Sequence, residues 1–188
     1  MQEIGVIMAR DFARLIIRSF KISDDFTRIA FISFGYATKI MIHFSSFFTK
    51  AEVLLEIKED YSFNDTASVN ETTMNVMDLL FSSDFGSRDD VSRYLIFLSN
   101  GKFTDKIGSR ESKEFRKRLN VKMLVAGVGM EIEKVPLEEL VEDTEKDIFI
   151  GEESFCANEM IQRIHELTDE FCDIKERPPT FPPSTVSP

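Results

Sequence analysis

The residues most suited to ligand binding follow the strongest apolar stretch of the chain. Tyr94–Gly101 ("YLIFLSNG") begins with five apolar residues in a row and closes on Ser99, Asn100 and Gly101. An unbroken apolar run that ends in turn residues predicts a strand buried on both faces. In an open α/β sheet, the ligand site lies just past the carboxyl ends of such strands. The polar segment Ser99–Asp105 is therefore the first candidate site.

Elsewhere the sequence does not indicate a catalytic set. The two histidines, His43 and His165, have no partner at zinc-ligand spacing and stand in no Ser-His-Asp or Cys-His arrangement. Gly127-Val128-Gly129 is an isolated GxG that ends an apolar run, whereas a phosphate-binding loop opens a helix. We therefore expect a protein that is not an enzyme, in which both histidines have structural roles.

Composition allows one domain and disfavours some partners. A chain of 188 residues can bury a sizeable core. Its net charge is −10, from 23 basic and 33 acidic residues, whereas a nucleic-acid or anionic-membrane surface needs a basic patch. No apolar run reaches the ~18–20 residues of a membrane span, and residues 1–20 lack the features of a signal peptide. We expect neither a nucleic-acid partner nor a membrane span.

The first part of the chain predicts a helix, a hairpin and two further helices. Apolar residues on one side predict the first helix at Gln2–Phe20. The runs Arg28–Phe34 and Lys39–Phe44 predict strands, and the short turn between them requires an antiparallel pair. The further helices are expected at residues 49–58 and 73–81, separated by a polar, irregular segment.

From Tyr94 onward, strands and helices alternate. Strands are predicted at residues 94–98, 121–128 and 147–150, and helices at residues 109–119, 136–141 and 157–171. This alternation implies parallel strands joined by right-handed crossovers. The expected fold is α/β: a doubly wound, mostly parallel sheet with one antiparallel edge strand and helices on both faces. Residues 1–172 form this domain, and the Pro/Ser/Thr-rich residues 173–188 predict a linker or tail.

The order and spacing of these segments resemble the von Willebrand factor type A domain family. The resemblance covers roughly Gln2–Cys172 and rests on "FARLIIRSFKI", "TRIAFISFGYATKIMIHF", "TMNVMDLLF", "YLIFLSNG", and "VKMLVAGVG" followed by "PLEELVEDTEKDIFIG". It implies a sheet of strand order 3-2-1-4-5-6. It also implies a divalent cation at the carboxyl end of that sheet, held by a DxSxS loop, a Thr and an Asp, with an acidic group of a binding partner completing the shell.

Matched position by position, this cation site is incomplete. Thr73 corresponds to the family's Thr, and Asn100 stands where the Asp belongs. Asn in place of Asp removes a negative charge, so any Mg2+ should bind weakly. The alternatives are that Thr73 is a helix N-cap and that Asn100 is a turn residue before Gly101. The DxSxS loop is absent from the sequence.

The family's first strand, which lies at the centre of the sheet, is absent from the sequence too. Its loss would leave "RIAFISF" and "YLIFLSN" on either side of a gap, with unpaired backbone groups that cost ~1–3 kcal/mol each. We therefore expect the natural polypeptide to extend upstream by roughly 15–25 residues. In extracellular members of the family, a Cys after the last helix often pairs with one ahead of the first strand. Cys172 fits this role, and its partner would lie outside this chain.

Cys156 and Cys172 flank the last predicted helix. A helix between them separates them by ~24 Å at ~1.5 Å per residue. A disulfide needs Cα atoms within ~7 Å, so the two cysteines cannot pair with each other. The alternative to an external partner for Cys172 is two free thiols.

Asn64 and Asn70 begin N-glycosylation sequons within one polar segment, where a secreted protein could carry glycans.

Together with the resemblance, these sequons predict a secreted, extracellular adhesion or matrix-type module. It would bind a protein ligand, such as collagen or another matrix protein, at the carboxyl-end rim of the sheet. We expect no cofactor, or Mg2+ held weakly. The alternatives are an intracellular scaffold subunit of a multiprotein complex, or a fragment without independent function.

Overall fold

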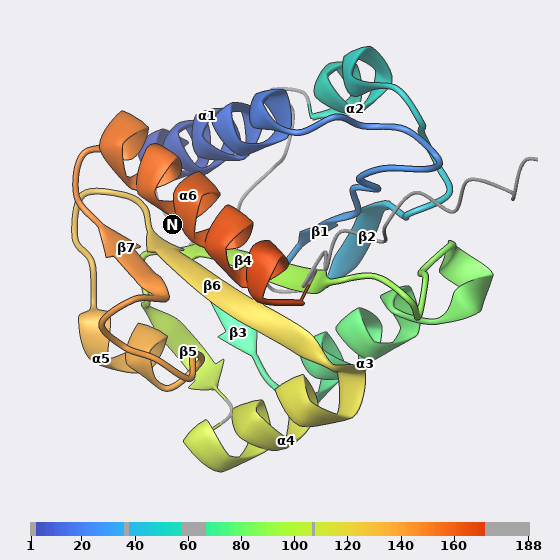
Figure 1. Ribbon diagram of the computed structural model, residues 1–188. Helices are drawn as coiled ribbons and strands as arrows, with labels where there is room; N and C mark the ends of the chain where they lie inside the picture. The colour runs from blue at the N-terminus through green and yellow to red at the C-terminus, as the bar shows by residue number, and fades with distance from the viewer. Residues whose placement is uncertain (1–2, 36–37, 58–66, 107, 172–188) are drawn as a thin grey trace, which may run out of the picture.

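A computed structural model of the chain describes residues 3–35, 38–57, 67–106 and 108–171 (Figure 1). It consists of short sheets covered by helices on both faces. The helices are α1 (Glu3–Ser19), α2 (Lys50–Glu56), α3 (Glu71–Leu80), the 3-10 turn η1 (Ser83–Phe85), α4 (Ser109–Leu119), α5 (Lys134–Glu138) and α6 (Glu153–Phe171). The strands are β1 (Phe31–Ser33), β2 (Lys39–Ile42), β3 (Ala67–Val69), β4 (Arg93–Ser99), β5 (Phe103–Lys106), β6 (Val121–Gly127) and β7 (Ile148–Ile150).

The largest sheet is parallel and has the strand order β4-β6-β7. Successive side chains of a strand point to opposite faces, so β6 contributes to two cores. Met123 and Val125 pack on one face, while Leu124 and Ala126 pack on the other. Burial on both faces explains the continuous apolar runs of these strands and confirms the predicted α/β fold with parallel strands.

Helices cover both faces of this sheet. On one face, α1 and α6 lie side by side (Figure 1), and Phe12 of α1 and Met160 of α6 pack in one cluster with Leu124 of β6. The cluster on the other face includes Met77 of α3 and Phe115 of α4. The two clusters enclose the sheet as a middle layer.

The predicted hairpin is confirmed, because β1 and β2 pair antiparallel. The pair forms a sheet of its own and packs with α1 and α2 in a third cluster. β1 is shorter than expected, since the pairing with β2 begins at Phe31 and is interrupted by a register shift before Ile32.

Several boundaries differ from the sequence predictions. Residues 67–69, expected to be irregular, form β3, which pairs parallel with the unpredicted strand β5. The last helix begins at Glu153, so Cys156 lies inside it and not ahead of it. Cys172 and the tail at 173–188 lie outside the described residues. Within the described residues, no helix has the length and apolar character needed to cross a bilayer.

A cavity of about 1040 Å³ lies between β1 and β4. We call this cavity the slot. Among the described strands, β1 pairs only with β2 and β4 only with β6, so no strand lies between them. The slot occupies the position at which the sequence predicts a missing central strand.

Candidate protein-binding rim

The loops that follow β4 and β6 meet at one edge of the molecule, because the carboxyl ends of parallel strands lie together. Asn100–Lys102 follow β4, and Val128–Glu131 follow β6. The start of α1 adjoins them. A Cβ built on Gly129 would lie 3.7 Å from both the Cα of Gly5 and the Cβ of Asn100. We call Asn100–Lys102, Gly129–Glu131 and the adjoining first turn of α1 the rim.

The turn at Asn100 and Gly101 is fixed by hydrogen bonds. The backbone N–H of Gly101 donates to the Ser99 hydroxyl at 3.1 Å, and that of Lys102 donates to Oδ1 of Asn100 at 3.2 Å. The carbonyl of Asn100 accepts from the backbone N–H of Glu133 at 2.8 Å. Asn100 therefore has the role of a turn residue, one of its two predicted roles.

Gly101 is required in this turn. Its φ is +79°, a conformation that side-chain-bearing residues rarely adopt. A Cβ at this position would lie 2.1 Å from the carbonyl oxygen of Glu133. The turn and the segment leading into α5 are thus pressed together with no room for a side chain.

Thr73 lies in the first turn of α3, and its hydroxyl is 2.9 Å from that of Thr38. The side chain of Asn70 caps the helix by accepting from the backbone N–H of Thr73 at 3.2 Å. The N-cap of α3 is therefore Asn70, and the alternative prediction that Thr73 is the N-cap is wrong. Thr38 was not singled out from the sequence. Its position directly ahead of β2, the strand that pairs with β1, was the available signal.

The described residues near the rim do not fit a tightly held divalent cation. Mg2+ prefers hard oxygen ligands, usually including carboxylates. Thr73 and Asn100 offer a neutral hydroxyl and a neutral amide, and both take part in hydrogen bonds. In the part of the chain that the structure describes, no three His, Cys, Asp or Glu side chains gather as a metal site.

The rim instead presents charged and apolar side chains to solvent. Lys102 and Glu131 form an ion pair across it. The hydrogen bond to Glu131 raises the pKa of Lys102, and the same bond lowers the pKa of Glu131. Met130 is 75% exposed and Ile4, at the start of α1, is 52% exposed. Such a mixture suits contact with a protein surface.

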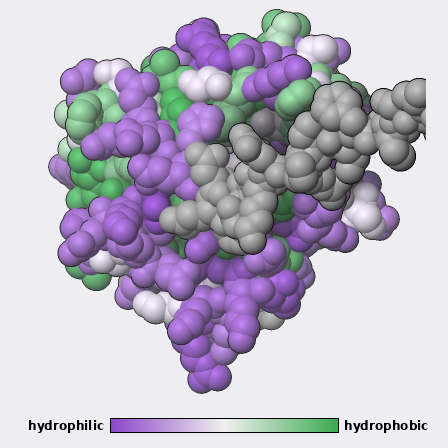
Figure 2. Space-filling view, in the orientation of Figure 1, coloured by the Kyte–Doolittle hydropathy of each residue, from purple (hydrophilic) through white to green (hydrophobic). Residues whose placement is uncertain are grey.

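The face seen in Figure 2 is mostly hydrophilic. Apolar residues show on the side where β7 and the start of α6 lie, and Ile150 and Phe155 are exposed on these elements. Scattered single apolar residues are normal on protein surfaces. We therefore place the candidate site at the rim, where the exposed residues gather around the strand ends.

The histidines have structural surroundings. Nδ1 of His43 is 3.0 Å from the Ser45 hydroxyl, and its ring packs edge-on against Phe85. The ring of His165 stacks on Phe20, with 5.5 Å between the ring centroids. Neither arrangement is that of a catalytic or metal-bound imidazole.

The remaining sequence candidates are a thiol and two asparagines. Cys156 is a buried, free cysteine, and burial raises the pKa of its thiol above the ordinary value. A raised pKa disfavours the reactive thiolate, so Cys156 serves as an apolar core residue. Asn70 caps α3 and is half-buried, while Asn64 lies outside the described residues.

Comparison with known protein families shows to which family this chain belongs. The von Willebrand factor type A domain family matches residues 1–168, which is most of the chain. The chain belongs to the von Willebrand factor type A domain family. No curated protein matches this type A domain.

Solved structures share the fold of this type A domain at low sequence identity. Proximal thread matrix protein 1 from the mussel byssus matches with a TM-score of 0.73 and 18% identity, over 85% of this chain and 43% of the mussel chain. The same values apply to the mussel protein with a zinc-occupied MIDAS motif. Manganese-loaded TRAP protein from Plasmodium vivax matches with a TM-score of 0.64 and 17% identity, over 82% of this chain and 63% of that chain. This chain thus spans less than half the length of the mussel protein.

Proposed function

We propose that this type A domain is an extracellular adhesion or matrix-type module that binds a protein ligand, collagen or another matrix protein, through its rim. Family membership supports a protein-interaction role, since type A domains are typically interaction modules. The similarity to a thread matrix protein favours a matrix setting. In this proposal the domain is not an enzyme, because the described residues present no catalytic set.

The observation that carries the proposal is the construction of the rim. Hydrogen bonds hold the Asn100–Gly101 turn rigidly against the segment leading into α5. Lys102 follows this fixed turn and pairs with Glu131, next to Met130 in the chain, while helix α1 holds Ile4. The backbone of the rim therefore has little entropy left to lose on binding. A central apolar anchor with charges around it is the composition that protein interfaces use.

Binding through this rim should not depend strongly on a divalent cation. The oxygens of Thr73 and Asn100 are neutral and already hydrogen-bonded, so they hold Mg2+ weakly at best. The affinity for the protein ligand must then come from direct contacts between the ligand and the rim. In the proposal, glycans at Asn64 and Asn70 accompany secretion, and Cys172 pairs outside this chain.

The proposal is tested by surface plasmon resonance of the full chain over immobilised fibrillar collagen. Met130→Ser should weaken binding by about tenfold, the effect of losing one interface anchor. Leu55→Ser is the matched control, because Leu55 is also exposed, at 68%, but lies on α2 away from the rim. EDTA should leave binding unchanged. Absence of collagen binding would exclude collagen as the ligand, and equal effects of the two variants would contradict the rim as the binding surface.

A further inference from the structure

Strand β7 forms an outer edge of the parallel sheet (Figure 1). Among the described strands it pairs only with β6. Val125 of β6 lies opposite Ile148 and donates its backbone N–H to the carbonyl of Asp147 at 2.9 Å. In a parallel ladder, this register turns the N–H and C=O of Phe149 toward β6. The N–H and C=O groups of Ile148 and Ile150 therefore point away from β6, along the outer edge.

These outward groups are arranged for pairing with another strand. Within the described residues, no backbone hydrogen bond outside the ladder with β6 involves Ile148 or Ile150. Backbone N–H and C=O groups are strong hydrogen-bonding groups, and an open strand edge is a template on which a further strand can pair. The outer edge of β7 thus offers such a template.

Exposed apolar side chains lie beside this edge. On one face of the sheet, Ile150 is exposed and its side chain meets that of Ile132, because a Cβ built on Gly127 would lie 2.9 Å from both. On the other face, α6 packs against β7, and Phe155 in the first turn of α6 is exposed. Figure 2 shows apolar residues on this side of the molecule. An extended apolar segment therefore finds apolar contacts here as well as backbone partners.

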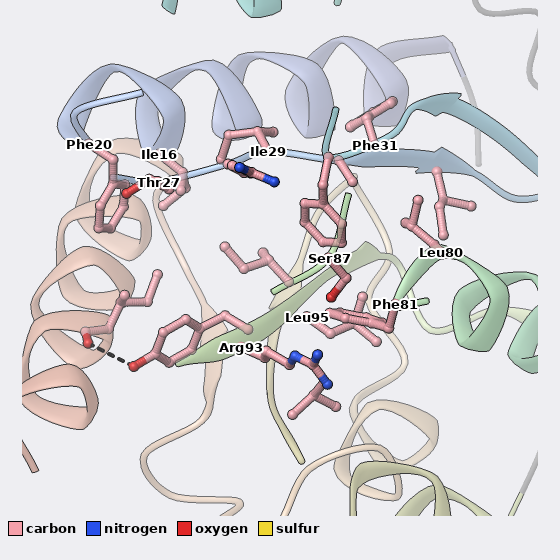
Figure 3. Close-up of a pocket in the computed structure, with 18 of the residues that line it drawn as sticks. Ile16, Phe20, Thr27, Ile29, Phe31, Leu80, Phe81, Ser87, Arg93 and Leu95 are labelled. Carbon is pink, nitrogen blue, oxygen red and sulfur yellow. Dashed lines mark hydrogen bonds between the residues drawn. The ribbon is translucent and has the colours of Figure 1, made fainter. Parts of the chain in front are cut away.

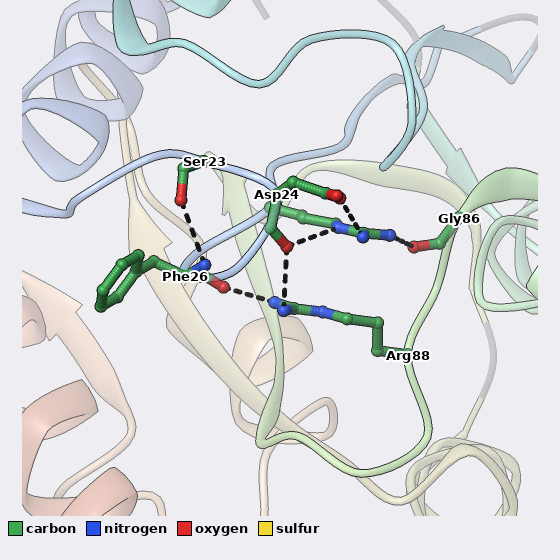
Figure 4. A network of polar contacts seen from close by, with 6 residues as sticks. Ser23, Asp24, Phe26, Gly86 and Arg88 are labelled. Atoms are coloured by element: carbon green, nitrogen blue, oxygen red, sulfur yellow. Dashed lines mark hydrogen bonds and ion pairs between the residues drawn. The ribbon is translucent and has the colours of Figure 1, made fainter.

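Other strand edges are less open to a partner. The edges of β1 and β4 face the slot, into which Ile29 and Leu95 point (Figure 3). Arg28 donates to the carbonyl of Gly86 at 2.8 Å, which ties together the loops that lead into β1 and β4 (Figure 4). The edge strand β2 begins with the exposed Lys39, a charge of the kind that discourages pairing at an edge. β7 has the sequence IFI and contains no charged residue.

The charge of the molecule determines which partner suits this edge. The net charge is −10, and the exposed residues Glu145 and Glu152 lie on either side of β7 in the chain, with Lys146 as the only basic residue between them. A second copy of this chain carries the same excess of negative charge and is repelled. A segment with basic residues at its ends is attracted instead.

We propose that the outer edge of β7 is a strand-addition site for an extended segment of a protein partner, with alternating apolar residues and Lys or Arg at its ends. The segment pairs with the outward N–H and C=O groups of Ile148 and Ile150. Its apolar side chains pack beside Ile150 and Phe155. Backbone pairing supplies affinity in this mode of recognition, and side-chain contacts supply specificity. The site does not use the rim and is independent of the function proposed for it.

The probe is the fluorescein-labelled heptapeptide Lys-Val-Thr-Val-Thr-Val-Lys, titrated with the full chain and followed by fluorescence anisotropy. Ile150→Pro removes an outward N–H but no hydrogen bond to β6, and proline is tolerated where the N–H of an edge strand points outward. Ile150→Ala is the matched control, because it removes more of the side chain but keeps the N–H. Melting temperatures show that both variants are folded.

The peptide should bind, and Ile150→Pro should weaken binding about tenfold or more relative to Ile150→Ala, because it removes a backbone donor from the pairing edge. A peptide with Glu in place of both Lys should bind more weakly. Absence of binding by the basic peptide, equal effects of the two variants, or equal binding of the two peptides would overturn the proposal.

Hydrogen exchange of the unmutated chain, followed by NMR, gives a second readout that needs no variant. The basic peptide should slow exchange of the amides of Ile148 and Ile150 and leave the amides of β2 unchanged, because newly paired amides are protected. Protection of β2 instead of β7 would overturn the proposal. So would a dimer of the chain alone in size-exclusion chromatography that Ile150→Pro abolishes, because it would identify a second copy as the occupant.

Discussion

At the residue scale, Gly101 shows how backbone conformation controls the rim. Replacing it with Ala forces a Cβ toward the carbonyl of Glu133 and places a side chain at φ +79°. We predict that Gly101→Ala lowers the free energy of unfolding by about 2 kcal/mol or more. Urea denaturation measures the loss. Gly108→Ala is the matched control, because a Cβ there meets only the flexible carboxylate of Glu111 and the change should be small. Similar losses for both variants would contradict this role of Gly101.

Glu153, in the first turn of α6, links stability to pH. Burial, and secondarily the charge of Asp11, raise the pKa of Glu153 above its ordinary value, and its Oε1 is buried without a partner within the described structure. A carboxyl group with a raised pKa in the folded state destabilises the fold as pH rises from its unfolded pKa through its folded pKa. Below both values this penalty vanishes.

Glu153→Gln should therefore stabilise the protein at pH 7 and have little effect at pH values where the carboxyl is protonated in both states. Urea midpoints measured across this pH range give the test. The exposed Glu159, on the same helix, supplies the control Glu159→Gln. A stabilisation that is the same at all pH values would show that the charge of Glu153 is not its cause.

At the element scale, α1 and α6 depend on each other through their shared core. Met160 of α6 is fully buried in the cluster that includes Phe12 of α1 and Leu124 of β6. We predict that Met160→Ala lowers the free energy of unfolding by about 2–5 kcal/mol, the usual loss for a large core side chain. Met130→Ala, at an exposed position, should cost little. Thermal and urea unfolding of the two variants should differ clearly, and equal stabilities would exclude Met160 as a core residue.

The elements that could be predicted from the sequence are those with a strong apolar pattern. Four elements appear close to their expected bounds: β4, β6, α1 and α4. Strands buried on both faces leave a continuous apolar run in the sequence, and helices buried on one side leave apolar residues at helical spacing. β3 and β5 could not be predicted, because they are only three and four residues long, with the sequences ASV and FTDK, and owe their strand form to each other. A strand that forms only through pairing with a distant strand leaves no periodic apolar pattern in its own sequence.

Part of the candidate site could be predicted from the apolar pattern of the strands. The rim follows from strand ends, so Asn100 and its neighbours could be located from the apolar run before them. The contact of Thr73 with Thr38 joins residues 35 positions apart and could not be read from spacing. The Asn70 cap of α3 was not predicted. Thr73 was expected as a cation ligand or, alternatively, as the N-cap, because both residue types cap helices and the chain offers them within one turn.

At the scale of the whole molecule, the net charge of −10 should make stability depend on salt. Like charges repel more strongly in the compact folded state than in the expanded unfolded chain, and salt screens this repulsion. Salt also weakens exposed ion pairs such as Arg110 with Glu114, but each of these contributes little. The net repulsion should therefore decide whether salt raises or lowers the free energy of unfolding.

We predict that raising sodium chloride from about 20 mM to about 200 mM at pH 7 increases the free energy of unfolding, by less than about 1 kcal/mol. Urea midpoints measured at both salt concentrations give the sign. Arg163 pairs with the buried Asp147, with 3.0 Å between Nε and Oδ1, and provides the contrast, because partial burial of the pair reduces screening. The loss of stability on Asp147→Asn should then be nearly the same at both salt concentrations. A fall in stability with salt would mean that surface ion pairs outweigh the net negative charge.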